Sequence, residues 1–260
     1  MPERVVIFND RKLRLVADVH SGQRQSDPAG KRIVILVPGL THHRPDPKSD
    51  LYAPRLTAMG FDVCAFDPSG CGESDDDQIT IRKHIADLQS VLSHFCSKGY
   101  EEIGVIGFSF GGLIAIWSWD TWVKAMVLVA PVTHVNPDPL SRFTAEELQE
   151  YESRGIITIT KPAGSLRERV ILDRVWIEER KTLDYQTALG RVQCPVKIIH
   201  GNEDALVPIQ DSINAIKLLP PGSRLEIVNQ MGHGPDLALQ VEIADSSCGW
   251  LADKMKCNIA

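Results

Sequence analysis

The 260-residue sequence has no apolar run long enough to cross a membrane and no excess of positive charge. A membrane-spanning helix needs roughly 18 or more consecutive apolar residues. The first ten residues also lack the apolar segment and the small-residue cleavage site of a signal peptide. Lysine and arginine number 28 against 34 acidic residues, a formal net charge of −6, whereas nucleic-acid binding normally needs a basic face. We expect a cytoplasmic protein without a nucleic-acid partner, and the sequence is compatible with a homodimer.

Cysteine is sparse and is not spaced for metal binding. No two of the six cysteines form a C-x-x-C pair, and no histidine cluster accompanies them at zinc-ligand spacing. The neighbours His42 and His43 lack a carboxylate or a third histidine at a fitting distance along the chain. We therefore expect free thiols in a reducing compartment and no metal site. The cysteines are Cys64, Cys71, Cys96, Cys194, Cys248 and Cys257.

What the chain does contain is a regular alternation of β-rich runs and helical patterns. Apolar positions 81, 85, 88, 92 and 95 step by three and four residues, which is typical of an amphipathic helix. Strands alternating with helices predict a mostly parallel sheet with helices on both faces. We expect strands at 13–20, 33–37, 61–66, 103–107, 125–130, 196–200 and 225–228, and further helices at 111–119, 209–218 and 241–255.

One long segment, residues 132–191, departs from this rhythm and carries many charges of both signs. Thr144 and Glu147 have the spacing of a capping box, so a helix is expected to begin there. Residues 156–160 favour a strand and residues 166–180 a helix. So long an irregular stretch would be unusual within a sheet core. We interpret residues 132–191 as a cap inserted between core segments 1–131 and 192–260.

The motif that carries chemistry is Gly107-Phe108-Ser109-Phe110-Gly111. It follows an expected strand and opens an expected helix, which is the setting of a nucleophile elbow. A serine on such a sharp turn projects its hydroxyl above the carboxyl edge of the sheet, where open α/β folds bind ligands. The helix N-terminus behind it favours a developing negative charge. Ser109 is therefore the predicted nucleophile.

A serine hydroxyl needs a base, and His233 is the predicted one. It is the only histidine after His200, and it lies between two glycines just past the last expected strand. This place agrees with the hydrolase order of serine, acid and histidine. His200, at a strand end, and His134, at the start of the expected cap, remain as rivals.

The predicted acid is Asp204, directly after the strand at 196–200. Its task would be to accept a hydrogen bond from the imidazole and to hold its tautomer. The adjacent Glu203 is an alternative if the turn is shifted by one residue, and Asp138 is a more distant one. Asp236 follows His233 too closely to be a comfortable partner.

Two backbone amides are needed for an oxyanion hole, and both can be named. Phe110 follows the nucleophile, and Leu40 lies in the loop after the strand at 33–37. Pro38, in the same loop, has no N–H to donate. Residues expected to contact substrate are Phe108 beside the serine and His42 at the pocket rim. In the expected cap, Trp176 and Tyr185 are expected to contact an apolar or aromatic acyl group.

Over nearly its whole length the chain resembles the α/β-hydrolase superfamily. Beyond the elbow, the resemblance lies in Val37-Pro38-Gly39-Leu40, in Asp67-Pro68-Ser69-Gly70-Cys71-Gly72-Glu73-Ser74, in the run from Gly201 to Pro208, and in Met231-Gly232-His233. The expected cap is similar to those of bacterial cinnamoyl and feruloyl esterases and of monoacylglycerol-lipase-like enzymes. The resemblance implies an α/β-hydrolase fold with an eight-stranded sheet. It also implies Ser109, Asp204 and His233 as triad, with Leu40 and Phe110 as oxyanion donors.

Two departures from the family pattern leave the subfamily unassigned. The oxyanion strand often ends in His-Gly in the family but ends in Pro38-Gly39 here, and the common Arg-Gly-His-Gly turn is replaced by residues 68–72.

The predicted function is hydrolysis of carboxylic esters of small or medium substrates through an acyl-enzyme, with no cofactor. A thioesterase, amidase or acyltransferase with the same triad is an alternative. Another alternative is a non-catalytic binding protein on a hydrolase scaffold.

Overall fold

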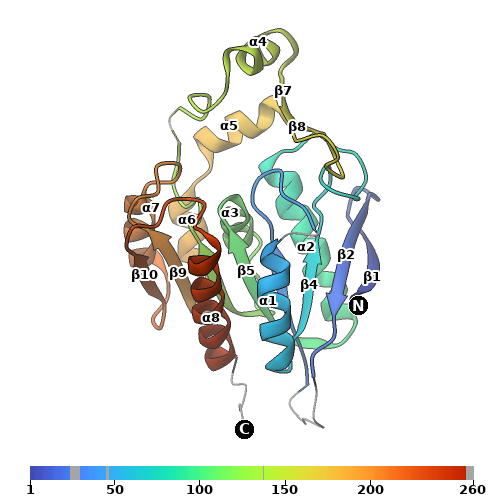
Figure 1. Cartoon of the computed structure of the whole chain (residues 1–260), viewed down its shortest axis with the longest axis vertical. Coiled ribbons are helices and arrows are strands. Elements are labelled where there is room, and N and C mark those ends of the chain that lie inside the picture. The colour runs from blue at the N-terminus through green and yellow to red at the C-terminus, as the bar shows by residue number, and fades with distance from the viewer. Residues whose placement is uncertain (24–29, 45–46, 137, 256–260) are drawn as a thin grey trace.

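The computed structural model describes residues 1–23, 30–44, 47–136 and 138–255, and a single large sheet forms its centre (Figure 1). Its strands are β1 (Glu3–Phe8), β2 (Arg14–His20), β3 (Lys31–Val37), β4 (Asp62–Phe66), β5 (Tyr100–Phe108), β6 (Val123–Val129), β9 (Val196–Gly201) and β10 (Arg224–Val228). They lie side by side in the order β1-β2-β4-β3-β5-β6-β9-β10. β2 runs antiparallel to both of its neighbours, β1 and β4, and the remaining neighbouring pairs of this sheet are parallel. The mostly parallel, eight-stranded sheet expected from the sequence is thereby confirmed.

Central and edge strands of the sheet differ in their burial. All six residues of β9 are buried, and so are all residues of β3 except Lys31. Both strands are therefore covered on both faces, although β9 includes the polar residues Lys197 and His200 beside its apolar ones. The edge strand β1 instead exposes Val6 and Phe8. The sequence did not predict β1, because its strand conformation depends on antiparallel pairing with β2, a contact between separate chain segments.

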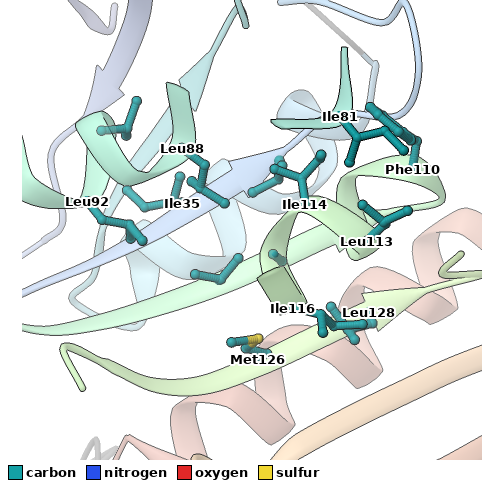
Figure 2. Packing of buried hydrophobic residues seen from close by; sticks show 14 of the residues in the cluster. Ile35, Ile81, Leu88, Leu92, Phe110, Leu113, Ile114, Ile116, Met126 and Leu128 are labelled. Atoms are coloured by element: carbon teal, nitrogen blue, oxygen red, sulfur yellow. The ribbon is translucent and has the colours of Figure 1, made fainter. Parts of the chain in front are cut away.

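Helices cover both faces of the sheet. Helices α1 (Pro47–Ala58) and α8 (Leu237–Lys254) pack side by side on one face, whereas α2 (Ile81–Ser97) and α3 (Phe110–Trp117) lie on the other (Figure 1). Two neighbours in β3 show the division. Val34 belongs to the core under α1 and α8, and Ile35 belongs to the core under α2 and α3 (Figure 2). Alternate strand residues point to opposite faces, so one strand serves both cores.

The helix boundaries refine the sequence expectations. The apolar stripe at 81–95 lies on α2. Its N-cap is Thr80, whose hydroxyl accepts the Lys83 amide at 3.1 Å. The helix expected at 241–255 begins earlier, at Leu237, with Asp236 as its N-cap. The pattern at 209–218 divides into α7 (Ile209–Ala215) and the 3₁₀ turn η1 (Ile216–Leu218), and α1 was not expected. None of the described helices combines the length and the apolar character that a bilayer crossing requires.

Between β6 and β9 the chain leaves the sheet and forms five further elements. These are α4 (Ala145–Arg154), a hairpin of β7 (Ile156–Thr160) and β8 (Arg169–Asp173), α5 (Arg174–Thr182) and α6 (Tyr185–Arg191). The capping box of Thr144 and Glu147 and the strand at 156–160 are confirmed. Figure 1 shows α4, the hairpin and α5 above the carboxyl ends of the parallel strands.

The helix expected at 166–180 is wrong in its first half. Residues Arg169–Asp173 form β8, which pairs antiparallel with β7, and the helix begins only at Arg174. The apolar run of Val170, Ile171 and Leu172 fits either conformation locally, and pairing with β7 decides for the strand.

Five cysteines are free thiols in the described structure, namely Cys64, Cys71, Cys96, Cys194 and Cys248. Cys257 lies outside the described residues. Burial raises the pKa of the Cys71, Cys194 and Cys248 thiols to about 12. These three thiols therefore stay protonated near neutral pH, which makes them poor nucleophiles.

Candidate active site

Ser109 lies on a strained turn between β5 and α3. Its backbone has φ 52° and ψ −115°, a region that a non-glycine residue rarely occupies. The turn is so tight that a Cβ on Gly107 would lie 2.7 Å from the Gly111 carbonyl oxygen. A Cβ on Gly111 would lie 2.3 Å from the carbonyl oxygen of Val37. Both glycines of the motif are thus required by close backbone contacts, and the turn directs the serine hydroxyl out of the sheet.

His233 lies beside this hydroxyl, with its Nε2 at 2.9 Å from Ser109 Oγ. The loop after β10 that carries it is anchored by Met231, whose side chain is buried. The Met231 carbonyl also accepts the Glu203 amide at 3.0 Å, which ties the loop to the end of β9. The imidazole itself is about a quarter exposed. It can therefore reach both the serine and a substrate entering from solvent.

Asp204 completes a chain of hydrogen bonds. Its Oδ2 lies 2.7 Å from His233 Nδ1, and its Oδ1 accepts the amides of Leu206 and Val207 at 2.9 and 2.8 Å. Burial by itself would raise the pKa of Asp204, but hydrogen bonds from His200, His233 and the Val207 amide hold that pKa well below its ordinary value. The carboxylate is therefore ionised at neutral pH and can orient the imidazole.

The alternative acids and bases named from the sequence are exposed or bonded to other groups. Glu203 is exposed, and Asp236 caps α8 by accepting the Leu239 amide. Asp138 is exposed and its amide donates to Asn136. His134 is exposed. The structure brings together Ser109, His233 and Asp204 and none of these alternatives.

His200 is the one rival that touches the same group. It is fully buried, and its Nε2 lies 3.0 Å from the Val207 carbonyl and 3.3 Å from Asp204 Oδ2. Its Nδ1 lies 2.7 Å from Ser212 Oγ. Because Nε2 faces two acceptors, it carries the proton, and Nδ1 accepts from the serine hydroxyl. His200 thus contacts the acid, while its other bonds go to Val207 and Ser212.

The loop after β3 passes next to the elbow. An added Cβ on Gly39 would lie 3.5 Å from the Phe108 carbonyl and 3.8 Å from Ser109 Cβ. Leu40 follows directly and lines the same cavity as Phe110. Phe110 is the first residue of α3, so its amide has no acceptor within the helix. Leu40 and Phe110 therefore line the same cavity as Ser109, and the role of their amides as oxyanion donors stays a prediction.

Arg44 anchors the far end of this loop. Its side chain is 2% exposed, and its amide donates to Asp67 Oδ1 at 2.6 Å. Its guanidinium bonds Asp18 and Glu73 at 2.7 and 2.6 Å. A buried arginine held by these carboxylates fixes the loop that carries Leu40.

A cavity of about 800 Å³ opens above the serine. Phe108, His42 and Trp176, named from the sequence, are in its lining. Trp176 packs on Phe110 and on Phe143, with ring centroids at 6.2 and 6.4 Å. The described lining also includes Gly39, Leu51, Tyr52, Val129, Val132, Asn136, Pro139, Ser141, Arg142, Arg180, Leu206, Val207, Pro235, Gln240 and Ile243.

The expectation that Tyr185 contacts the acyl group is corrected by the structure. This tyrosine is buried and does not line the described cavity; instead its hydroxyl accepts a hydrogen bond from Arg180. Its place at the start of α6 turns the ring toward the core beneath α5. Arg142 and Arg180 are lining residues that the sequence reasoning missed. The signal for Arg180 was available, because it follows Trp176 by four residues and so shares its face of α5.

Comparison with known proteins agrees with this geometry. Residues 28–170, more than half of the chain, match the family described as serine aminopeptidase, S33 (Hydrolase_4). The chain belongs to this family of the α/β-hydrolase superfamily and is a serine hydrolase. It is 25% identical to the serine hydrolase BPHL of Homo sapiens over 236 residues, which cover 80% of this chain and 75% of that protein.

Solved structures show the same fold. Est1E of Butyrivibrio proteoclasticus with bound ferulic acid superimposes with a TM-score of 0.78 at 18% identity, covering 97% of this chain and 99% of that one. A monoacylglycerol lipase of Paleococcus ferrophilus gives a TM-score of 0.71 at 17% identity, covering 93% and 99%. The α/β-hydrolase fold is thereby confirmed.

Proposed function

We propose that this serine hydrolase cleaves carboxylic esters through a covalent acyl-enzyme. The observation that carries the proposal is the hydrogen-bonded chain from Ser109 Oγ through His233 to Asp204, with distances of 2.9 and 2.7 Å. A serine on a strained elbow, a base within reach of its proton and an acid that orients the base are the parts that acyl transfer needs. Ser109 and His233 line one cavity, and Asp204 bonds the His233 imidazole.

In the first half of the reaction, Ser109 Oγ attacks the ester carbonyl while His233 Nε2 takes the hydroxyl proton. The tetrahedral oxyanion is held by the amides of Leu40 and Phe110, and the α3 N-terminus adds favourable potential. The intermediate then collapses. Its carbon–oxygen bond to the alcohol breaks, and His233 returns the proton to the leaving alkoxide.

In the second half, His233 takes a proton from water, whose oxygen attacks the acyl-enzyme. The second tetrahedral intermediate expels Ser109, which regains its proton from the imidazole. Asp204 stays ionised throughout and stabilises the imidazolium. These steps draw only on side chains and backbone amides, so the proposal includes no metal ion or cofactor.

Residues 132–191 are proposed to act as a cap on core segments 1–131 and 192–260. In support, Trp176 and Arg180 on α5 and Arg142 before α4 all reach the cavity lining. Their side chains would shape the acyl pocket and limit the entry of water.

The proposed substrates are esters of small or medium acids, with an aromatic ring or a short acyl chain. The cavity of about 800 Å³ lies in the range of small-molecule sites. Aromatic walls formed by Phe108, Phe110 and Trp176 support an apolar acyl group. Ferulic acid bound to the structurally similar Est1E agrees with this class. The cytoplasmic location and the possibility of a homodimer stay predictions.

A fluorophosphonate probe combined with a panel of esters tests the proposal. The intact protein should be labelled at one serine, and Ser109→Ala should abolish both labelling and ester turnover. Ser153→Ala, which removes an exposed hydroxyl on α4, is the matched control and should keep both. Labelling without ester turnover would point to a thioester or amide substrate, tested in the same panel. Absence of labelling would instead favour the non-catalytic binding protein.

A further inference from the structure

We propose that Arg142 and Arg180 bind an ionised carboxylate of the substrate, so that this protein acts on esters that carry a second, free acid group. The inference rests on the proposed ester hydrolysis at Ser109 and specifies its substrate class. It comes from the charge, the burial and the spacing of side chains on the cavity wall.

The charge of the cavity wall is one-sided. Arg142 and Arg180 are among its described lining residues, whereas no aspartate or glutamate is. The whole chain is acidic, with a formal net charge of −6, so this local excess of positive charge is not a general property of the surface. Two guanidinium groups on a partly enclosed wall attract an anion into the cavity.

Arg180 is held in place without being neutralised. It is 8% exposed, and its guanidinium donates to the His134 carbonyl at 3.1 Å and to the Tyr185 hydroxyl. Burial raises the pKa of Tyr185, so that hydroxyl is neutral near pH 7. Within the described part of the chain, Arg180 has no carboxylate at ion-pair distance. A buried charge without a counter-ion is unfavourable, and a substrate carboxylate would relieve it.

Arg142 presents a second charge at the same wall. Desolvation, followed by repulsion from Arg180, lowers its pKa. Glu147 and Asp211 interact with the two arginines only at longer range, and neither lines the described cavity. The Glu147 carboxylate is also occupied by the Thr144 amide at 2.8 Å. An incoming anion would therefore face two cations without a competing acid on the wall.

A series of aromatic rings leads from the reacting hydroxyl to Arg142. Phe110, next to Ser109, contacts Trp176, and Trp176 contacts Phe143. The Arg142 guanidinium lies over the Phe143 ring at 5.6 Å. This order fits a substrate with an ester at one end, an apolar spacer in the middle and a carboxylate at the other end. A planar guanidinium matches a carboxylate with two parallel hydrogen bonds.

Two nitrophenyl esters with the same acyl length test the inference. They are p-nitrophenyl hexanoate, which is neutral, and the mono-p-nitrophenyl ester of adipic acid, which ends in a carboxylate. We expect the wild-type protein to have the higher kcat/KM for the adipate ester. Arg142→Met should lower the adipate-to-hexanoate ratio of kcat/KM about tenfold, as expected for loss of a charge-assisted hydrogen bond.

Arg174→Met is the matched control. Its guanidinium also lies over an aromatic ring, that of Tyr151 at 5.6 Å, but Arg174 does not line the described cavity. This variant should leave the adipate-to-hexanoate ratio at the wild-type value. The inference would be overturned if Arg142→Met left the adipate-to-hexanoate ratio of kcat/KM at its wild-type value. Hydrolysis of the hexanoate ester would still support the proposed ester hydrolysis.

If neither ester is cleaved, a binding measurement tests the anion subsite independently of the proposed ester hydrolysis. Adipate is titrated calorimetrically into Ser109→Ala and into the double variant with Arg142→Met. Binding that weakens about tenfold without Arg142 supports the anion subsite even where ester hydrolysis has failed. Adipate binding that is absent, or equal in both variants, overturns it.

Discussion

His200 Nε2 lies 3.3 Å from Asp204 Oδ2, the same oxygen that His233 Nδ1 approaches at 2.7 Å. Two histidines thus meet one carboxylate oxygen, one of them fully buried and the other a quarter exposed. The nitrogens of the buried ring contact Ser212, Val207 and Asp204, whereas His233 contacts Ser109. We therefore interpret His200 as a positioning residue, which acts through Asp204.

Replacing His200 should weaken catalysis without ending it. His200→Phe removes one donor from Asp204 and leaves the Val207 carbonyl and the Ser212 hydroxyl without their partner. We expect kcat for an ester to fall about tenfold and stability to fall by about 1–3 kcal/mol. Ser212→Ala, which removes only the bond to Nδ1, is the control and should lower kcat less. Equal losses of kcat in the two variants would contradict a role through Asp204.

Substitution of the acid should be far more damaging than substitution of its neighbour. Asp204→Asn keeps the shape but favours the wrong imidazole tautomer, so kcat should fall about 10⁴-fold. Glu203→Gln changes an exposed side chain one residue away and should keep kcat within about twofold. Steady-state kinetics on a nitrophenyl ester measures both. If the large loss follows Glu203→Gln instead, the acid has been misassigned.

The low pKa of Asp204 should be visible in the acid dependence of stability. Burial opposes ionisation, but the bonds from His200, His233 and Val207 outweigh it and lower the pKa in the folded state. In the unfolded chain the Asp204 carboxyl has an ordinary pKa of about 3.9. As pH falls, the unfolded state therefore binds this proton before the folded state does. The stabilisation by Asp204 is therefore complete above that pH and is lost below it.

Urea unfolding of wild type and Asp204→Asn at several pH values measures this effect. The free energy of unfolding of the wild type relative to the variant should decline as pH falls below about 5. A difference that stays constant from pH 6 to the acid limit of folding would show that the Asp204 carboxyl has the same pKa in both states.

Two glycines should respond to alanine in opposite directions. Gly111→Ala would place a Cβ 2.3 Å from the Val37 carbonyl and 2.5 Å from that of Pro38. We expect a loss of about 2 kcal/mol or more, together with lower activity, because the loop that carries Leu40 would be displaced. Gly249, exposed within α8, meets nothing within 4 Å. Gly249→Ala should therefore stabilise the protein by up to about 1 kcal/mol. Thermal unfolding monitored by circular dichroism compares both variants with wild type.

Local features could be read from the sequence because their signals lie within a few residues. Residues 33–37 of the buried strand β3 form one uninterrupted apolar run, and the capping box of Thr144 and Glu147 spans four residues. The elbow at Ser109 is similar, since its glycines are required by a turn that the motif itself forms. The edge strand β1 and the strand β8 were missed, because each depends on a partner strand for its conformation.

The sequence by itself determined the fold class, the elbow and a short set of candidate acids and bases. Only the tertiary structure decided that Asp204, not Glu203, faces His233, since adjacent residues in a turn differ in direction and not in chemistry. It likewise turned Tyr185 away from the cavity and brought Arg142 and Arg180 to its wall. Such convergence depends on how separate segments pack together; locally, the sequence encodes only that Arg180 shares a face of α5 with Trp176.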